Sequence, residues 1–257
     1  MDGILRGDLD FGFVSCWGLA VGVSKGRDVV SISTYTGQNG FGFFFPKDAN
    51  VKSLKDLNGK NIVVSPASFD TQLFPSVLES VGLPGDMMKR LNVDPAQKVP
   101  TYARGQADVV VSHVPYASPI IQAQRPSDYI LWSSVGFTLP DYCLTTSRKK
   151  LQEDPKLVEA FLRASYAAIA DAVKKPEDAA AATLELNPVL EKDKTLEQWK
   201  LTSTILFSED SKSCPLGWHS KSDWTKGLKT LQQFGGLEGS VDDHSKFYTN
   251  QYFPCSR

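Results

Sequence analysis

The feature that most constrains the fold is an internal repeat that joins a helix end to a strand. The sequence RGDLDFGFVS begins at Arg6 and RGQADVVVSH begins at Arg104, so both share R-G-x-x-D followed by a strand-like run. In each copy the glycine is typical of a helix end, and the aspartate begins the strand. Two copies of this unit in one chain predict an α/β fold built from two related lobes.

Short β-rich runs alternate with helical or turn-rich segments up to residue 147, and the remainder of the sequence reads as helical. Runs such as NIVV and DVVV are apolar without alternation, which is typical of strands covered on both faces of a parallel sheet. Asp154 and Pro155 mark the start of one clear helix, and Gly235 marks the end of another. The predicted class is α/β with an α-helical C-terminal part.

Composition excludes several classes of partner and site. The chain has 257 residues and a formal net charge of −1, so we expect no nucleic acid and no membrane surface as partner. Four cysteines without C-x-x-C spacing and three histidines indicate no metal site. Cys214 and Cys255 could pair in an oxidising compartment, and free thiols are the alternative.

Several motifs resemble those of substrate-binding proteins of ABC importers in the nitrate/sulfonate/taurine and thiamine-pyrimidine group. The resemblance covers residues 5–147, and its most diagnostic part is K-D-x-x-x-x-S-L-K-D-L-x-G-K from Lys47 to Lys60. It implies a two-lobed periplasmic-binding-protein type II fold with the ligand between the lobes. It also implies a monomer without a cofactor, a small-molecule ligand, a membrane permease as partner, and a periplasmic or other extracytoplasmic location.

The resemblance also fixes the expected domain limits. Lobe one comprises residues 1–46 and 138–257, lobe two comprises residues 47–137, and extended segments near 38–46 and 136–146 connect them. The second copy of the repeat follows a complete strand–helix–strand–helix unit, whereas only MDGIL precedes the first. We therefore expect lobe one to lack its first strand–helix–strand, and the secretion signal or lipoprotein anchor of the family is likewise missing from this sequence.

Ligands of such sheets bind beyond the carboxyl ends of the strands. The residues expected there are Ser15, Cys16, Trp17, Gln38, Asn39, Ser68, Phe69, Asp70, Thr71, His113, Tyr116 and Asp141. Purely structural roles are the alternatives for several of them: helix capping by Ser68 and Thr71, core packing by Trp17 and Cys16, and a structural hydrogen bond for His113.

The segments that carry these residues contain no Lys or Arg, and Asp70 is expected to accept a hydrogen bond from a ligand N–H group. We therefore predict binding of a neutral or cationic nitrogen heterocycle, such as a thiamine-precursor pyrimidine, without catalysis. The alternatives are a sulfonate or aromatic-acid binder of the same family, a sensor domain, and an enzyme. The enzyme would be of the pyrimidine-synthesis type or a hydrolase that uses Cys16 and His113.

Overall fold

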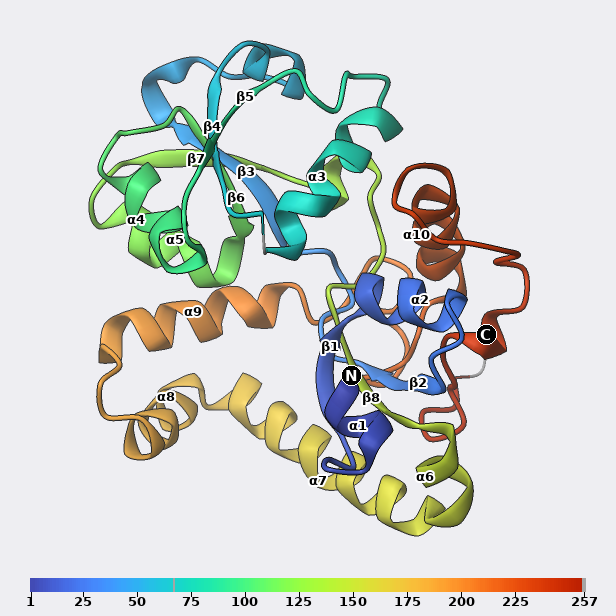
Figure 1. Ribbon diagram of the computed structural model, residues 1–257. Coiled ribbons are helices and arrows are strands. Elements are labelled where there is room, and N and C mark those ends of the chain that lie inside the picture. Colours follow the sequence, from blue (N-terminus) through green and yellow to red (C-terminus); the bar gives the residue numbers. More distant parts are fainter. Residues whose placement is uncertain (67, 256–257) are drawn as a thin grey trace. The chain divides into compact units, whose positions relative to one another are not determined.

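The computed structural model describes residues 1–66 and 68–255, and it contains two separate sheets (Figure 1). The chain forms two compact units. Unit one comprises Met1–Asn39, Thr138–Ala179 and Thr202–Arg257, and unit two comprises Gly40–Phe137 and Ala180–Leu201. Residues 40–46 and 180–201 thus lie in unit two, whereas the sequence analysis assigned them to lobe one.

Unit one is built on a sheet of three strands in the order β1-β8-β2. These are β1 (Gly12–Ser15), β2 (Val29–Thr34) and β8 (Tyr142–Ser147), and both neighbours run antiparallel to β8. Its core packs Val30, Ile32 and Leu144 of the sheet against Val158 and Leu162 of a long helix. The helices of this unit are α1 (Asp2–Arg6), α2 (Cys16–Ser24), α6 (Arg148–Glu153), α7 (Pro155–Lys174) and α10 (Lys221–Phe234), with a 3-10 turn at His244–Lys246.

Unit two is built on a mixed sheet of five strands in the order β5-β4-β6-β3-β7. Its strands are β3 (Phe41–Pro46), β4 (Asn61–Val64), β5 (Lys89–Asn92), β6 (Val109–His113) and β7 (Ser127–Leu131), with helices α3 (Phe69–Ser80), α4 (Lys98–Ala103) and α5 (Val114–Gln122). Strand β4 runs parallel to β5 and β6, as predicted, but β3 is antiparallel to both of its neighbours. Four 3-10 turns cover Lys47–Ala49, Leu54–Leu57, Pro95–Gln97 and Ser133–Val135. Two further helices, α8 (Pro176–Leu186) and α9 (Lys192–Thr204), each cross a limit between the units.

Several helices and strands begin or end where local sequence signals predicted. Gly7 and Gly105 adopt left-handed φ angles of 81° and 78° after their helices, and the strands β1 and β6 follow. Asp154 caps α7 by accepting a hydrogen bond from the Leu157 N–H at 3.3 Å. Helix α3 begins at Phe69 and contains Pro75, and the Ser68 side chain forms no capping hydrogen bond, so the alternative of a capping role for Ser68 does not hold.

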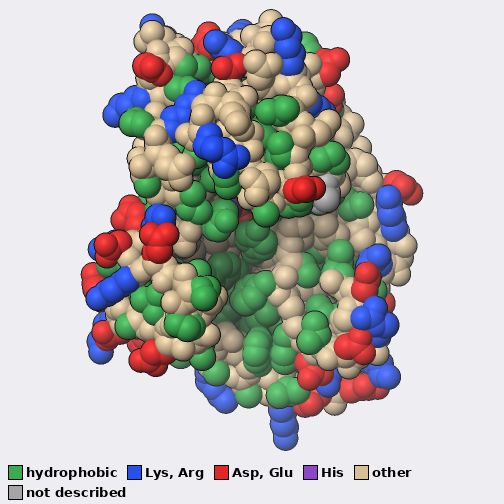
Figure 2. Space-filling view, turned by 60° about the vertical axis from the view of Figure 1, so that its left-hand side comes forward, with side chains coloured by type: hydrophobic (Ala, Val, Ile, Leu, Met, Phe, Trp, Pro, Cys, Tyr) green, Lys and Arg blue, Asp and Glu red, His purple; other side chains and the backbone are tan. Residues whose placement is uncertain are grey.

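Every cysteine belongs to a disulfide in the part of the chain that the structure describes. Cys214 and Cys255 are paired, which decides between the two alternatives left open by the sequence, and a second bond, between Cys16 and Cys143, was not predicted. On the face drawn in Figure 2, acidic and basic side chains intermingle, in keeping with the net charge of −1. Among residues 1–66 and 68–255, no helix combines the length and the apolar character that a bilayer span requires.

Candidate functional site

Four predicted residues of unit one meet where α2 begins and β8 starts. Strand β1 ends at Ser15, whose hydroxyl accepts a hydrogen bond from the Gly18 N–H at 3.0 Å and so caps α2. The next N–H, that of Cys16, donates to the carbonyl of Asp141 at 2.9 Å. Trp17 follows in the first turn of α2 and is half-buried, whereas Asp141 is buried. The register of β1 and β8 thus brings these residues together.

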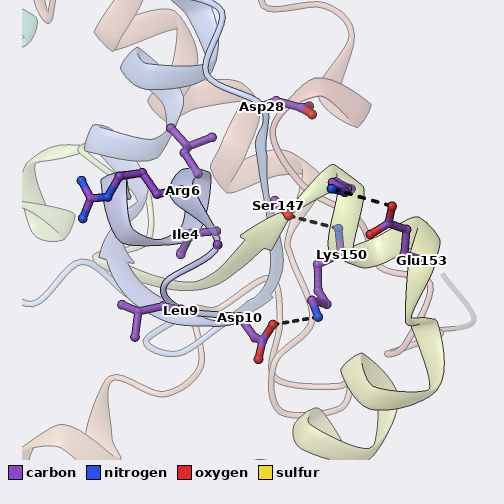
Figure 3. A pocket seen from close by; sticks show the side chains of 11 residues that line it. Ile4, Arg6, Leu9, Asp10, Asp28, Ser147, Lys150 and Glu153 are labelled. Carbon is purple, nitrogen blue, oxygen red and sulfur yellow. Dashed lines mark hydrogen bonds and ion pairs between the residues drawn. The ribbon is translucent and has the colours of Figure 1, made fainter.

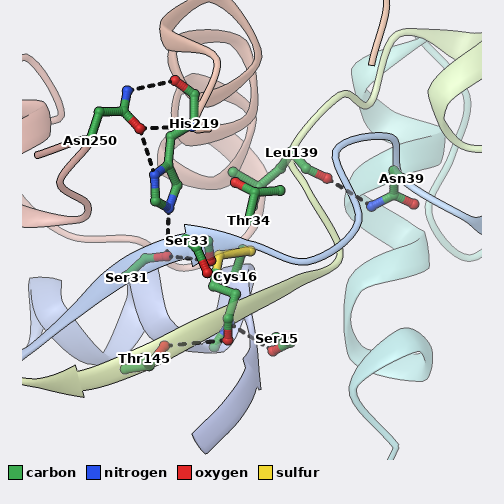
Figure 4. The surroundings of a disulfide bond; sticks show 12 residues. Ser15, Cys16, Ser31, Ser33, Thr34, Asn39, Leu139, Thr145, His219 and Asn250 are labelled. Carbon is green, nitrogen blue, oxygen red and sulfur yellow. Dashed lines mark hydrogen bonds between the residues drawn. A yellow bond between two sulfur atoms is a disulfide. The ribbon is translucent and has the colours of Figure 1, made fainter. Parts of the chain in front are cut away.

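Cys16 is fully buried in its disulfide with Cys143 (Figure 4). A nucleophilic cysteine must be a thiolate, and a sulfur in a disulfide is not one. The alternative of a hydrolase that uses Cys16 therefore has no nucleophile, and the Cys16 side chain acts as a cross-link.

The remaining predicted residues of unit one lie on the segment that follows β2. The Asn39 amide donates to the carbonyl of Leu139 at 2.9 Å, and the Gln38 N–H donates to the carbonyl of Ile205 at 3.0 Å. Asn39 is buried and Gln38 is half-buried. Of this pair, Gln38 presents the more accessible side chain.

Unit two gathers aromatic rings at the carboxyl end of β6. The ring of Phe41 lies 4.9 Å from that of Phe69, edge to face, and 5.3 Å from that of His113, measured between ring centroids. Phe41 pairs directly with His113 in the β3–β6 register, which brings their side chains together. Phe69 and His113 are half-buried. Sequence reasoning missed Phe41, although it is the first aromatic of the run FGFFF.

Tyr116 of α5 is 55% exposed, and its carbonyl accepts a hydrogen bond from the Gln198 amide at 2.9 Å. The exposed ring of Tyr116 is accessible to a ligand. This ring takes no part in the ring contacts centred on Phe41.

The predicted role of Asp70 as a free acceptor is wrong. Its carboxylate forms a buried ion pair with Lys98 of α4, and it also accepts a hydrogen bond from the Thr71 N–H at 2.9 Å. Both side chains of the ion pair are nearly inaccessible. The Thr71 hydroxyl accepts from the Ser65 N–H at 3.1 Å, so Thr71 has a structural role as well. The sequence analysis did not find the positive charge of Lys98 beside Asp70, because Lys98 lies outside the segments that follow the strands.

Sequence reasoning also missed a buried histidine. His219 is enclosed in unit one, where its Nε2 lies 2.7 Å from the Ser31 hydroxyl and its Nδ1 lies 2.9 Å from Oδ1 of Asn250. The Asn250 amide donates to the His219 carbonyl at 3.0 Å, so its oxygen faces the ring and accepts from Nδ1–H. Burial, opposed by the hydrogen bond with Asn250, lowers the pKa of His219 to about 4. This neutral histidine joins β2 to the C-terminal segment.

Among the described residues, at least two sizeable pockets lie away from the predicted ligand residues. One of them, in unit one between α1 and α6, has a volume of about 370 Å³, and two ion pairs form within its lining (Figure 3). Lys150 lies 2.8 Å from Asp10, and Lys149 lies 4.0 Å from Glu153. A pocket of about 390 Å³ in unit two is lined by Leu54, Val81 and Ile130, among others. No group of metal-ligating side chains occurs among the described residues.

Comparisons with known proteins identify relatives over most of the chain. A family model described as NMT1/THI5 like matches residues 2–179. The riboflavin-binding protein RibY of Chloroflexus aurantiacus is 24% identical over 236 residues, which cover 90% of this chain and 66% of RibY. The 4-amino-5-hydroxymethyl-2-methylpyrimidine phosphate synthase of Legionella pneumophila is 22% identical over 261 residues, which cover 96% of this chain and 77% of that protein. This chain therefore spans slightly less than two thirds of RibY.

Solved structures share the fold at low identity. The alkanesulfonate-binding protein SsuA from Xanthomonas axonopodis pv. citri, bound to MOPS, has a TM-score of 0.69 and 15% identity, covering 93% of this chain and 80% of SsuA. The periplasmic aliphatic sulphonate binding protein SsuA from Escherichia coli has a TM-score of 0.72 and 13% identity, covering 96% of this chain and 78% of that one. The predicted periplasmic-binding-protein fold is confirmed.

Proposed function

The chain belongs to the NMT1/THI5-like family, and we propose that it is the solute-binding component of an ABC importer that captures a small, flat nitrogen heterocycle. In this proposal it binds without catalysis, and its partners are the ligand and a membrane permease. The location is extracytoplasmic, which the two disulfides support because such bonds persist in oxidising compartments.

The observation that carries the proposal is the set of aromatic rings at the carboxyl end of β6. Phe69 and His113 are half-buried around Phe41, so they combine a fixed position with a surface that a ligand can reach. Flat aromatic side chains favour flat ligands through stacked or edge-to-face contacts. In unit one, half-buried Trp17 offers a second such surface.

The charge of Asp70 gives no support to a charged ligand. Because the Asp70 carboxylate is neutralised by Lys98, it neither attracts a cationic ligand nor repels an anionic one. The same pairing occupies the Lys98 ammonium, which a sulfonate would otherwise use. Because the pairing of Asp70 removes one argument for a cationic ligand, we propose a neutral heterocycle, with a pyrimidine as the simplest example.

The names of both relatives mention a nitrogen heterocycle, riboflavin in one and a pyrimidine in the other, which supports the same ligand class. The second candidate is a sulfonate binder, which the two SsuA structures favour.

Titration calorimetry with riboflavin, 4-amino-5-hydroxymethyl-2-methylpyrimidine and MOPS tests the proposal. We expect at least one heterocycle to bind and to be recovered chemically unchanged, and MOPS to bind more weakly. Phe69→Ala should weaken binding by about 1–3 kcal/mol, the range for stacking of a base on an aromatic side chain. Tyr129→Ala is the matched control, because Tyr129 is an exposed aromatic of the same unit that packs on Phe44 instead. Tighter binding of MOPS, whose ring is not flat, than of riboflavin or the pyrimidine would refute the assignment.

A further inference from the structure

The disulfide between Cys16 and Cys143 lies among the predicted ligand residues of unit one. Resting on the proposed function, we infer that this disulfide is a positioning element of the binding site. It holds the first turn of α2, which carries Trp17, against the start of β8, which follows Asp141. Without the bond, the turn loosens and the affinity for the ligand falls.

Three segments converge on the cross-link (Figure 4). In the sheet register, Cys143 lies opposite Val14 of β1 on one side and Thr34 of β2 on the other. Immediately beside it, the Tyr142 carbonyl accepts a hydrogen bond from the Tyr35 N–H at 2.9 Å. Cys16 adds both its sulfur and its N–H, which donates to the Asp141 carbonyl at 2.9 Å. The disulfide therefore fixes the backbone from which the side chains of Trp17 and Asp141 project.

The two elements that meet at this point are short. Strand β1 has four residues, lies at the edge of its sheet and pairs with β8. Helix α2 has nine residues, and two of them, Gly18 and Gly22, lower its stability because glycine loses the most backbone entropy on folding. A short edge strand opens locally at low cost, whereas buried Leu19 and Ala20 hold the later part of α2 in the core. A covalent bond at the first residue of α2 limits that opening where the ligand residues lie.

The second disulfide provides a matched control. Cys214 and Cys255 join the segment before α10 to the C-terminal segment of unit one. None of the predicted ligand residues lies between or beside these two cysteines. Removing this bond should therefore lower the stability of unit one without moving Trp17.

The test compares Cys16→Ala/Cys143→Ala with Cys214→Ala/Cys255→Ala and the unchanged protein. Affinity for the heterocycle that the unchanged protein binds is measured by calorimetry, well below the melting temperature of each variant. We expect the dissociation constant to rise about five- to tenfold in the first variant, because the turn must then be ordered on binding, and to stay unchanged in the second. Hydrogen exchange should accelerate in residues 16–24 of the first variant and not in residues 221–234.

The outcomes separate this inference from the proposed function. Equal affinity and equal exchange in residues 16–24 would overturn the positioning role while leaving the proposed function intact. If the unchanged protein binds none of the probes, the proposed function fails and the role in ligand binding fails with it. The exchange measurement then still decides whether the disulfide holds the first turn of α2.

Discussion

Replacing Lys98 by methionine probes the buried ion pair of unit two. Lys98 is 6% exposed and Asp70 is 4% exposed, so neither charge is solvated by bulk water. Methionine retains an unbranched apolar stem of similar length but removes the ammonium. Asp70 then keeps a hydrogen bond from the Thr71 N–H on one oxygen, while the oxygen that faced Lys98 loses its donor. The perturbation therefore leaves a buried carboxylate without its compensating charge.

Breaking a buried pair by removing one partner costs about 3–5 kcal/mol. This is a large part of the roughly 5–15 kcal/mol by which a native protein exceeds its unfolded state. For a chain of this size it corresponds to a fall in melting temperature on the order of 10 °C. Asp70→Asn should be similarly harmful, since it leaves the Lys98 ammonium buried. The double variant should recover to within about 1–2 kcal/mol of the unchanged protein, because no buried charge remains.

Urea unfolding followed by tryptophan fluorescence measures these differences, since Trp132 is fully buried in the same unit. The four proteins form a double-mutant cycle whose coupling energy isolates the pair. If Lys98→Met lies within about 1 kcal/mol of the unchanged protein, or if the double variant is as unstable as the sum of the single ones, the buried-pair reasoning is refuted.

Two further predictions concern unit one. Because the pKa of His219 is about 4 in the folded chain and its ordinary value is 6.5, its contribution to stability is complete above pH 6.5 and is lost as the pH falls toward 4. Acidification from pH 7 to 4 should cost about 3 kcal/mol through this residue, and His219→Gln should reduce the measured pH dependence by that amount in urea unfolding. Gly227→Ala in α10 should be destabilising despite the roughly 1 kcal/mol by which alanine favours a helix. Its Cβ would lie closest to the Cβ of Leu139 and only 2.9 Å from the Leu139 Cα, so the backbone must shift. Thermal unfolding should show a loss that Leu139→Ala does not restore, because alanine keeps both of those atoms.

Features that depend on residues close together in the sequence, such as helix ends, could be predicted from the sequence. Asp154, Pro155 and the glycines of the R-G-x-x-D repeat set helix ends within a few residues, and each has the predicted role. The direction of pairing was readable only in part. A run buried on both faces is apolar whether its neighbours are parallel or antiparallel, so NIVV and FGFFF look alike although β4 and β3 pair differently.

The candidate site depended on pairs that are distant in sequence. Asp70 and Lys98 are 28 residues apart, and His219 and Asn250 are 31 apart, so no spacing rule connects them. Strand β2 shows the same dependence on distant partners: Ser31 and Ser33 are buried, and their partners are His219 and Tyr166. Such partners satisfy polar groups that alternation rules would place in solvent.

The disulfide of Cys16 and Cys143 also has a topological consequence. The sequence separation of its cysteines is 127 residues, and the whole segment Gly40–Phe137 lies inside the covalent ring that it closes. In the chain-entropy description, closing a ring of this size disfavours the unfolded chain by roughly 4–5 kcal/mol. A protease cut anywhere in that segment would open the ring but release no fragment, because both new ends stay tethered through the sulfur bridge. Electrophoresis with and without a reductant would therefore tell a nicked molecule from an intact one.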